Sequence, residues 1–237
     1  MAQSSLSKKA LAIITARGGS KRIPNKNIKL FLGKPIIKYS IEAAIKSNCF
    51  DEIMVSTDSE KISKIAKDSG ALVPFMRSKF NSGDYSTTAD VLIEVINSYL
   101  KLGKEFDYVC CIYPTAPFLK AKTLKSALKK MIDLNCKSVL PVVKFSYPIL
   151  RSFKMENNKL ELNWPNHLNT RSQDLPNSYH DAGQFYFFKT DFFLSEKKLF
   201  TDDTYGIEMP ETEVQDIDNM EDWTIAEMKY KILNKID

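Results

Sequence analysis

The chain has 237 residues, of which 43% are hydrophobic and 27% charged, a balance that fits a globular protein and excludes disordered and fibrous classes. The formal net charge of +5 is spread along the chain, so we expect a polyanionic small ligand as partner and no nucleic acid. Residues 1–9 are polar and no apolar run approaches membrane-spanning length, so we expect no membrane contact and a cytoplasmic location.

The first apolar run, at residues 11–14, predicts a strand buried on both faces of a parallel sheet. The next segment, R-G-G-S-K-R at residues 17–22, sets two glycines among three cations. Backbone N–H groups there can surround an anion while the cations neutralise it, which predicts a phosphate cradle; a plain turn with solvated charges is the alternative. Its spacing matches neither the P-loop nor the dinucleotide fingerprint. The expected ligands are Arg17, Gly18, Gly19, Ser20 and Lys21.

Strand and helix patterns then alternate as far as residue 143. Apolar runs predict strands at residues 51–57, 71–75, 107–113 and 137–143. Amphipathic stretches predict four helices in this part of the chain. One begins at Pro35, the next two span Ser59 to Gly70 and Ser86 to Leu102, and the last follows the P-T-A-P turn at residues 114–117. This alternation predicts an open α/β fold with a mainly parallel sheet and right-handed crossovers.

The regular pattern is lost between residues 144 and 181. Prolines, asparagines and short alternating pieces predict an irregular, partly antiparallel insertion there. We expect this insertion to lie within a single domain that covers residues 1–237. A hydrophobic strand is expected at residues 183–188, and a final helix from about Asn219 to Ile236.

Open α/β sheets bind ligands at the carboxyl ends of their strands, where this chain places several polar side chains. Asp216 and Asp218 are separated by Ile217, and in an extended segment their side chains point to the same side. Two carboxylates on one side suit Mg²⁺ that also binds phosphates, so the pair predicts a metal site. In the alternative interpretation, Asp218 caps the final helix and Asp216 is a solvated loop charge.

Four further polar residues each have two interpretations. Asp58 and Thr88, both at expected helix starts, either belong to the helix N-terminus or help to form a nucleotide pocket beside the cradle. Arg171 offers a guanidinium to a planar carboxylate, or is an exposed structural arginine. His180 has no neighbour at metal-ligand spacing, so it indicates a hydrogen-bond donor to a substrate or a packed ring.

Five segments of the chain together resemble one known family. They are A-R-G-G-S-K-R-I-P-N-K-N at residues 16–27, V-S-T-D-S-E-K-I at 55–62, P-T-A-P at 114–117, R-S-Q-D-L-P at 171–176 and D-I-D at 216–218. They closely resemble the signatures of cytidylyltransferases that activate nonulosonic (sialic-type) acids, in the nucleotide-diphospho-sugar transferase fold family. The resemblance covers nearly the whole chain. It implies a three-layer Rossmann-like fold, transfer from CTP to a nine-carbon sugar acid, Mg²⁺ as cofactor, and a homodimer formed through the insertion.

The resemblance also implies roles for individual residues. Arg17 and Lys21 correspond to catalytic triphosphate ligands, and Asn27 to a contact with the nucleotide. Asp216 and Asp218 correspond to the Mg²⁺ ligands, and Asp218 is in addition a candidate proton acceptor. The residues expected to bind the sugar acid are Tyr113, Arg171, Tyr179, His180 and Gln184.

One position departs from the family members that act on N-acetylneuraminate. These usually carry glutamine before the Pro-Thr pair, whereas this chain has Tyr113. Together with Y-H-D-A-G-Q-F-Y-F at residues 179–187, this turn resembles the branch that activates pseudaminic acid. Tyrosine differs from a primary amide in size and donor geometry, so N-acetylneuraminate should fit less well.

Several alternatives stay open at this point. The acceptor could instead be N-acetylneuraminate or a legionaminic acid. The donor could be UTP or a nucleotide with another base in place of CTP. The protein could also bind a nucleotide without catalysing a reaction. The intact D-I-D segment argues against the non-catalytic alternative. A retaining glycosyltransferase with a D-x-D metal site is a further alternative, but its carboxylate pair normally sits in mid-chain.

Overall fold

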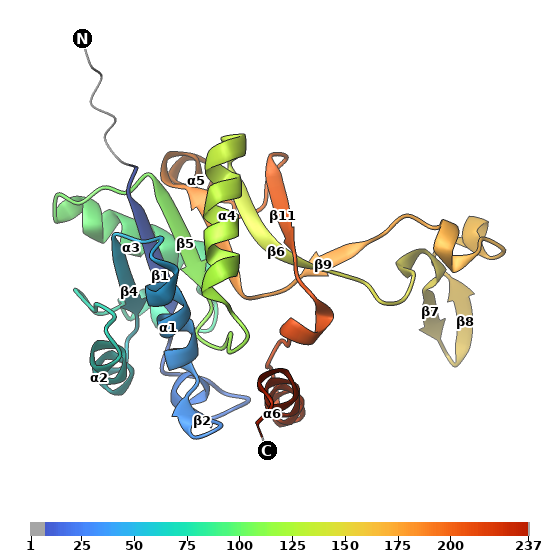
Figure 1. The fold of residues 1–237 in the computed structure, drawn as a ribbon, viewed down its shortest axis with the longest axis horizontal. Coiled ribbons are helices and arrows are strands. Elements are labelled where there is room, and N and C mark those ends of the chain that lie inside the picture. The colour runs from blue at the N-terminus through green and yellow to red at the C-terminus, as the bar shows by residue number, and fades with distance from the viewer. Residues whose placement is uncertain (1–7, 237) are drawn as a thin grey trace, which may run out of the picture.

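The computed structural model describes residues 8–236 of the protein. Within them, a mixed seven-stranded sheet has the order β11-β6-β10-β5-β1-β4, and the short strand β9 pairs with β6 (Figure 1). Its strands are β1 (Ala10–Thr15), β4 (Glu52–Ser56), β5 (Tyr108–Ile112), β6 (Ser138–Lys144), β9 (Tyr179–Asp181), β10 (Phe185–Lys189) and β11 (Thr204–Glu208). The helices are α1 (Ile37–Ser47), α2 (Glu60–Asp68), α3 (Thr88–Lys101), α4 (Ala121–Leu134), α5 (Thr190–Glu196) and α6 (Met220–Asn234).

Helices cover both faces of the sheet and make three layers (Figure 1). The side chains of β1 alternate between the faces, so Ala12 and Ile14 cluster with residues of α1 and α4, and Leu11 and Ile13 with residues of α3 and α5. β1 is therefore buried on both faces, and the predicted three-layer α/β fold is confirmed. None of the helices in residues 8–236 is long and apolar enough to cross a bilayer.

The mainly parallel sheet contains an antiparallel strand, and two predicted elements differ from the structure. β1 pairs in parallel with β4 and β5, and β6 with β11, but β10 lies antiparallel between β5 and β6. The strand expected at residues 71–75 is wrong, because its pairing is a single bridge from Leu72 to Met54. The helix expected from Pro35 begins at Ile37, since Pro35 pairs with Leu30 in a hairpin of β2 (Leu30–Phe31) and β3 (Lys34–Pro35).

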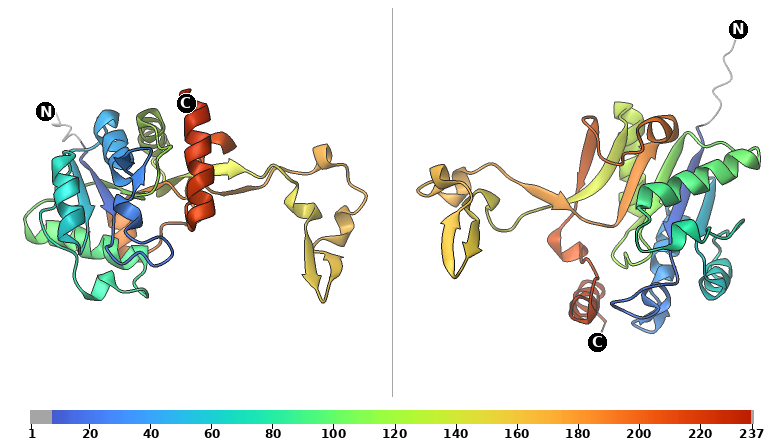
Figure 2. Two further views of the ribbon diagram at one scale, coloured as in Figure 1. Left: turned by 90° about the horizontal axis from the view of Figure 1, so that it is seen from below. Right: turned by 180° about the vertical axis from the view of Figure 1, so that it is seen from behind.

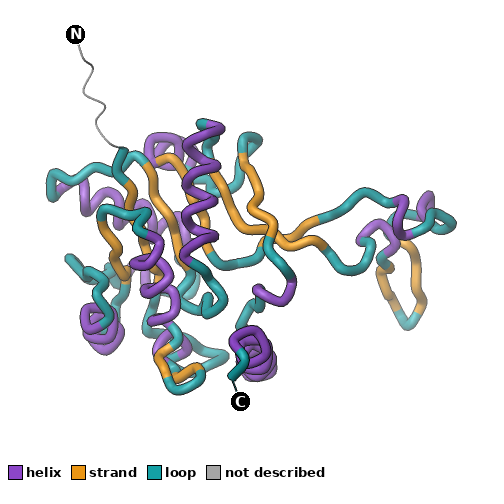
Figure 3. The backbone as a smooth tube through the Cα atoms, in the orientation of Figure 1, coloured by secondary structure: helices purple, strands orange, loops and turns teal. Residues whose placement is uncertain are grey.

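Residues 145–178, hereafter the arm, project from the sheet between β6 and β9 (Figure 2). The arm is irregular and partly antiparallel, as its sequence predicts, and it carries a hairpin of β7 (Phe153–Glu156) and β8 (Lys159–Leu162). Asn157 and Asn158 turn this hairpin with positive φ angles of 49° and 63°, a conformation that asparagine tolerates. Loops join the arm to the sheet on both sides (Figure 3).

A separate apolar cluster fixes the D-I-D segment beside the cradle. Ile217 is 1% exposed and packs in one cluster with Ile23, which follows the cradle, and with Trp223 of α6. Asn219 caps α6 by accepting two backbone N–H bonds, so the helix-cap interpretation of Asp218 is wrong. Burial of the isoleucine therefore holds the flanking carboxylates near the cationic segment while leaving them outside the core.

Candidate active site

A cavity of about 400 Å³ lies at the carboxyl ends of β1 and β5. The cradle contributes Arg17, Ser20 and Lys21 to its wall, the turn after β5 contributes Tyr113, and the segment before α6 contributes Asp218. Segments far apart in the sequence thus meet around one cavity. Cations and a carboxylate share its surface, which is the arrangement that a metal-bound polyphosphate requires.

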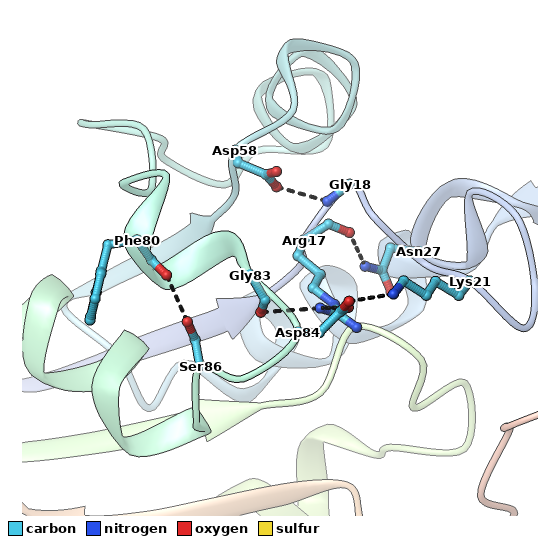
Figure 4. Close-up of polar contacts among 9 residues, drawn as sticks. All are labelled: Arg17, Gly18, Lys21, Asn27, Asp58, Phe80, Gly83, Asp84 and Ser86. Carbon is cyan, nitrogen blue, oxygen red and sulfur yellow. Dashed lines mark hydrogen bonds and ion pairs between the residues drawn. The ribbon is translucent and has the colours of Figure 1, made fainter.

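Asp58 and Asn27 hold the cradle in shape (Figure 4). The Gly18 N–H donates to Asp58 Oδ1 at 2.8 Å, and Asn27 Nδ2 donates to the Arg17 carbonyl at 2.8 Å. Ser59, not Asp58, caps α2, so the helix-cap interpretation of Asp58 is wrong. A Cβ on Gly18 would lie 3.1 Å from the Ser59 Cβ, and this close approach of two loops favours glycine.

Two of the three cations of the cradle, Arg17 and Lys21, are bound to the carboxylate of Asp84, which precedes α3 (Figure 4). Arg17 Nη1 donates to Asp84 Oδ1 at 3.0 Å, and Lys21 Nζ donates to Asp84 Oδ2. The hydrogen bonds from Lys21 and Arg17 hold the pKa of Asp84 below its usual value, so the carboxylate is charged at neutral pH.

Lys26 links the cradle to the D-I-D segment. Its Nζ donates to the Ile217 carbonyl at 2.7 Å and lies 3.8 Å from Asp218 Oδ1, which forms an ion pair with Arg22 Nη2 at 2.9 Å. Burial lowers the pKa of Lys26, and the nearby charges of Asp218 and Asp216 oppose that shift. Lys26 thus lies close to both carboxylates of the predicted metal site.

The two carboxylates line different hollows in this structure. Asp218 lies in the cradle cavity, whereas Asp216 lines a second pocket of about 320 Å³ together with His180 and Asp181. The expectation that they point to one side assumed an extended strand, but residues 214–218 pair with no strand and bend at Asp218. No cluster of three His, Cys, Asp or Glu side chains able to hold a metal occurs in residues 8–236. Mg²⁺ often takes only one or two carboxylates and completes its shell with phosphates and water, so this donor set fits it.

Tyr113 forms one wall of the cavity, and its ring is held in place by Tyr186. Its ring packs edge-on against Tyr186 at 5.4 Å, and Tyr186 Oη donates to Asp181 Oδ2 at 2.7 Å. Burial raises the pKa of both phenols, so both stay protonated at neutral pH. Thr88 begins α3, as expected, and its side chain also lies beside the Tyr113 phenol.

The other predicted sugar ligands are dispersed in this single chain. Arg171 lies on the arm, where Asp174 accepts from its Nε at 2.6 Å and from its Nη2 at 3.1 Å. Tyr179 is exposed, and the His180 ring packs on Phe145 at 4.9 Å between centroids. Gln184 is buried, and its Nε2 donates to a backbone carbonyl at 2.8 Å. The structure brings Tyr113 to the cavity but not these four, and their roles stay predictions.

Sequence patterns did not point to three residues that shape the site. Asp84 stands in a Gly-Asp pair that reads as a plain loop, and Tyr186 in an apolar run that reads as core. Lys26 stands in the quoted R-I-P-N-K-N string, but its contact with the D-I-D segment depends on the packing of α6. Each depends on a long-range contact, for which local patterns carry no signal.

Comparison with known proteins gives this site a context. The family model described as "Cytidylyltransferase" matches residues 11–233. The chain belongs to the cytidylyltransferase family. It is 44% identical over 225 residues to a pseudaminic acid cytidylyltransferase of Campylobacter jejuni subsp. jejuni serotype O:23/36 (strain 81-176), covering 94% of this chain and 97% of the relative.

A further relative and a solved structure are also similar to this chain. A CMP-N,N'-diacetyllegionaminic acid synthase of Legionella pneumophila subsp. pneumophila (strain Philadelphia 1) is 33% identical over 221 residues, with 92% of this chain and 94% of the relative covered. A solved CMP:2-keto-3-deoxy-manno-octonic acid synthetase in complex with CTP superposes with a TM-score of 0.68 at 17% identity, over 96% of this chain and 99% of that one. The family match and the 44% identity confirm the predicted family, and the superposition confirms the predicted fold.

Proposed function

We propose that the protein transfers the cytidylyl group of CTP to the anomeric hydroxyl of a nonulosonic acid and releases pyrophosphate. The observation that carries this proposal is the cavity that the cationic cradle shares with Asp218. Membership of the cytidylyltransferase family supports the reaction type. The relative at 44% identity, named as a pseudaminic acid cytidylyltransferase, favours pseudaminic acid as the acceptor.

The residues around the cavity align substrates and neutralise charge, which is most of what a phosphoryl-type transfer asks of a protein. Arg17 and Lys21 bind the polyphosphate of CTP, and Ser20 lies on the same wall of the cavity. Asn27 fixes the backbone of Arg17 so that the guanidinium stays directed to the phosphates. Asp218 is the group we assign to accept the proton of the attacking hydroxyl.

Mg²⁺ is the proposed cofactor, which Asp218 would hold at the cradle together with phosphate oxygens. Asp216, which lines the neighbouring pocket, is the proposed second ligand and would have to turn toward Asp218 to reach the same ion. When bound, the ion supplies positive charge that stabilises the transferring phosphate. Arg22 and Lys26, which both form ion pairs with Asp218, direct that carboxylate toward the cradle.

A pyrophosphate-release assay over nucleotides and sugar acids tests the proposal. We expect turnover with CTP and pseudaminic acid, and at least tenfold lower kcat/KM with N-acetylneuraminate or legionaminic acid, because the Tyr113 wall differs in shape and donors from an amide. UTP, ATP and GTP serve as matched controls for the base.

Two results of this assay would contradict parts of the proposal. Preference for N-acetylneuraminate would remove the argument from Tyr113 but keep the reaction. CTP binding without pyrophosphate release from any of the three acids would identify a non-catalytic nucleotide-binding protein instead.

We also propose that the protein is a homodimer whose subunits meet through the arm, in the cytoplasm. The arm exposes large apolar side chains that a free solvated segment would not be expected to carry. They are Tyr147, Phe153, Met155, Leu160 and Leu168, each more than half exposed. A second copy of the chain would cover them, and it would bring Arg171 of the arm toward a neighbouring subunit.

The double variant Met155→Glu/Leu160→Glu is expected to be a monomer, because both introduced charges would be buried at the dimer interface. Sedimentation velocity at micromolar concentration measures the change. Ile132→Glu on α4 is a matched control, because Ile132 is 48% exposed outside the arm, and it should remain dimeric. A monomeric wild-type protein would contradict the proposal.

A further inference from the structure

Asp84 engages the two cations that the cradle offers to a polyphosphate. Its Oδ1 accepts from Arg17 at 3.0 Å, and its Oδ2 accepts from Lys21 (Figure 4). The neighbouring Gly83 carbonyl accepts from the same Arg17 nitrogen at 3.3 Å. A carboxylate of the chain itself thus makes the contacts that phosphate oxygens of a ligand would make.

The segment that carries Asp84 is anchored on both sides of its tip, and within it the Ser86 hydroxyl donates to the Phe80 carbonyl at 2.8 Å (Figure 4). On one side, the Ser78 N–H and hydroxyl donate to Glu94 of α3 at 2.8 and 2.5 Å. On the other side, Thr87 caps α3 and exchanges bonds with Asp90. Residues 83–86 between these anchors form a turn outside any helix or strand. Asp84 can therefore leave the cations without unfolding α3.

The exposure of the tip supports such a displacement. The side chain of Asp84 is 43% exposed, and that of the adjacent Tyr85 is fully exposed. Exposed ion pairs contribute little free energy, because water and salt compete for both charged groups. A ligand with several phosphate charges can outcompete one carboxylate, whereas a ligand with a single phosphate has less charge with which to replace it.

We infer that Asp84 is an internal competitor for the polyphosphate site: it pairs with Arg17 and Lys21, and the phosphates of a ligand must displace it before they can bind both cations. This inference rests on the proposed function, which assigns those cations to the triphosphate of CTP. Because it competes for the same two cations, Asp84 weakens the binding of CTP and of the product pyrophosphate. It therefore favours release of the product.

Calorimetric titration of the full chain with inorganic pyrophosphate and with CMP tests this inference. Asp84→Asn removes the competing charge but keeps the size of the side chain, so pyrophosphate should bind about three- to tenfold more tightly. Binding of CMP should change by less than about twofold, because CMP lacks the outer phosphates. Asp84→Glu keeps the charge and should restore wild-type affinity.

Asp133→Asn is the matched control for net charge. Asp133 is also an exposed carboxylate paired with a lysine, Lys129 at 2.6 Å, but it lies on α4. Its replacement should leave pyrophosphate affinity within about twofold of wild type, because charges beyond a Debye length are screened. The difference between the two asparagine variants isolates the local effect of Asp84.

The possible outcomes distinguish failure of this inference from failure of the proposed function. If the wild type binds pyrophosphate but Asp84→Asn binds it equally or more weakly, the inference fails and the proposed function stands. An equal gain in Asp133→Asn, or an equal gain for CMP, also overturns it. If the wild type binds neither CTP nor pyrophosphate, the proposed function itself fails.

Discussion

Lys21→Ala is expected to lower kcat/KM for CTP about 10²- to 10³-fold, the loss typical when one charge-stabilising donor is removed. Lys21 lines the cavity, and its side chain is 75% exposed with Asp84 as its ion-pair partner. Little of the fold depends on it, so the loss should appear in turnover and not in stability. Pyrophosphate release measures the rate, and thermal unfolding checks that the variant is folded.

Lys61→Ala provides the control for Lys21→Ala. Lys61 is an exposed lysine of α2, so its replacement removes the same unit of charge away from the cavity wall. Its kcat/KM should stay within about twofold of wild type. A Lys21→Ala variant with a near-normal rate would remove this residue from the mechanism.

Asp216→Asn and Asp218→Asn should each reduce turnover by about 10²-fold or more, and should raise the Mg²⁺ concentration that gives half-maximal activity. An amide keeps the shape of the side chain but loses the charge that a divalent cation needs. Pyrophosphate release over a Mg²⁺ titration measures both effects. Chelation of divalent cations should abolish turnover in the wild type.

Glu221→Gln is the control for the two aspartate variants. Glu221 is an exposed carboxylate in the first turn of α6, close in sequence to the D-I-D segment. Removing its charge should leave the Mg²⁺ dependence unchanged. If Asp216→Asn and Asp218→Asn showed the same Mg²⁺ dependence as Glu221→Gln, the two aspartates would not be the metal site.

The elements that local patterns predicted correctly are those with a strong periodic signal. The run at residues 11–14 became β1, and the stretch expected to be helical from Ser86 to Leu102 became α3, whose buried face runs from Val91 to Tyr99. Residues 71–75 have a similar apolar composition, but a strand also needs a partner along its length, and there it finds one bridge. Leu72 is 47% exposed, so apolar composition alone predicts neither the pairing nor the full burial of this segment.

The chain after β10 illustrates a second kind of failure. The short helix α5 and the edge strand β11 were not predicted, because seven residues carry little periodic signal and β11 is only partly buried. Its partner β6 lies far back in the sequence, so the pairing is a property of the assembled sheet. The same holds for Asp84, whose partners precede it by more than sixty residues.

The buried isoleucine between the two aspartates has a consequence for how the enzyme loses activity. Ile217 ties the position of both carboxylates to the docking of α6 in a small cluster outside the main sheet. Local opening of such a peripheral cluster costs less free energy than global unfolding. Inactivation by gentle warming would then begin at this corner, with the carboxylates drifting from the cations while the central sheet is still intact.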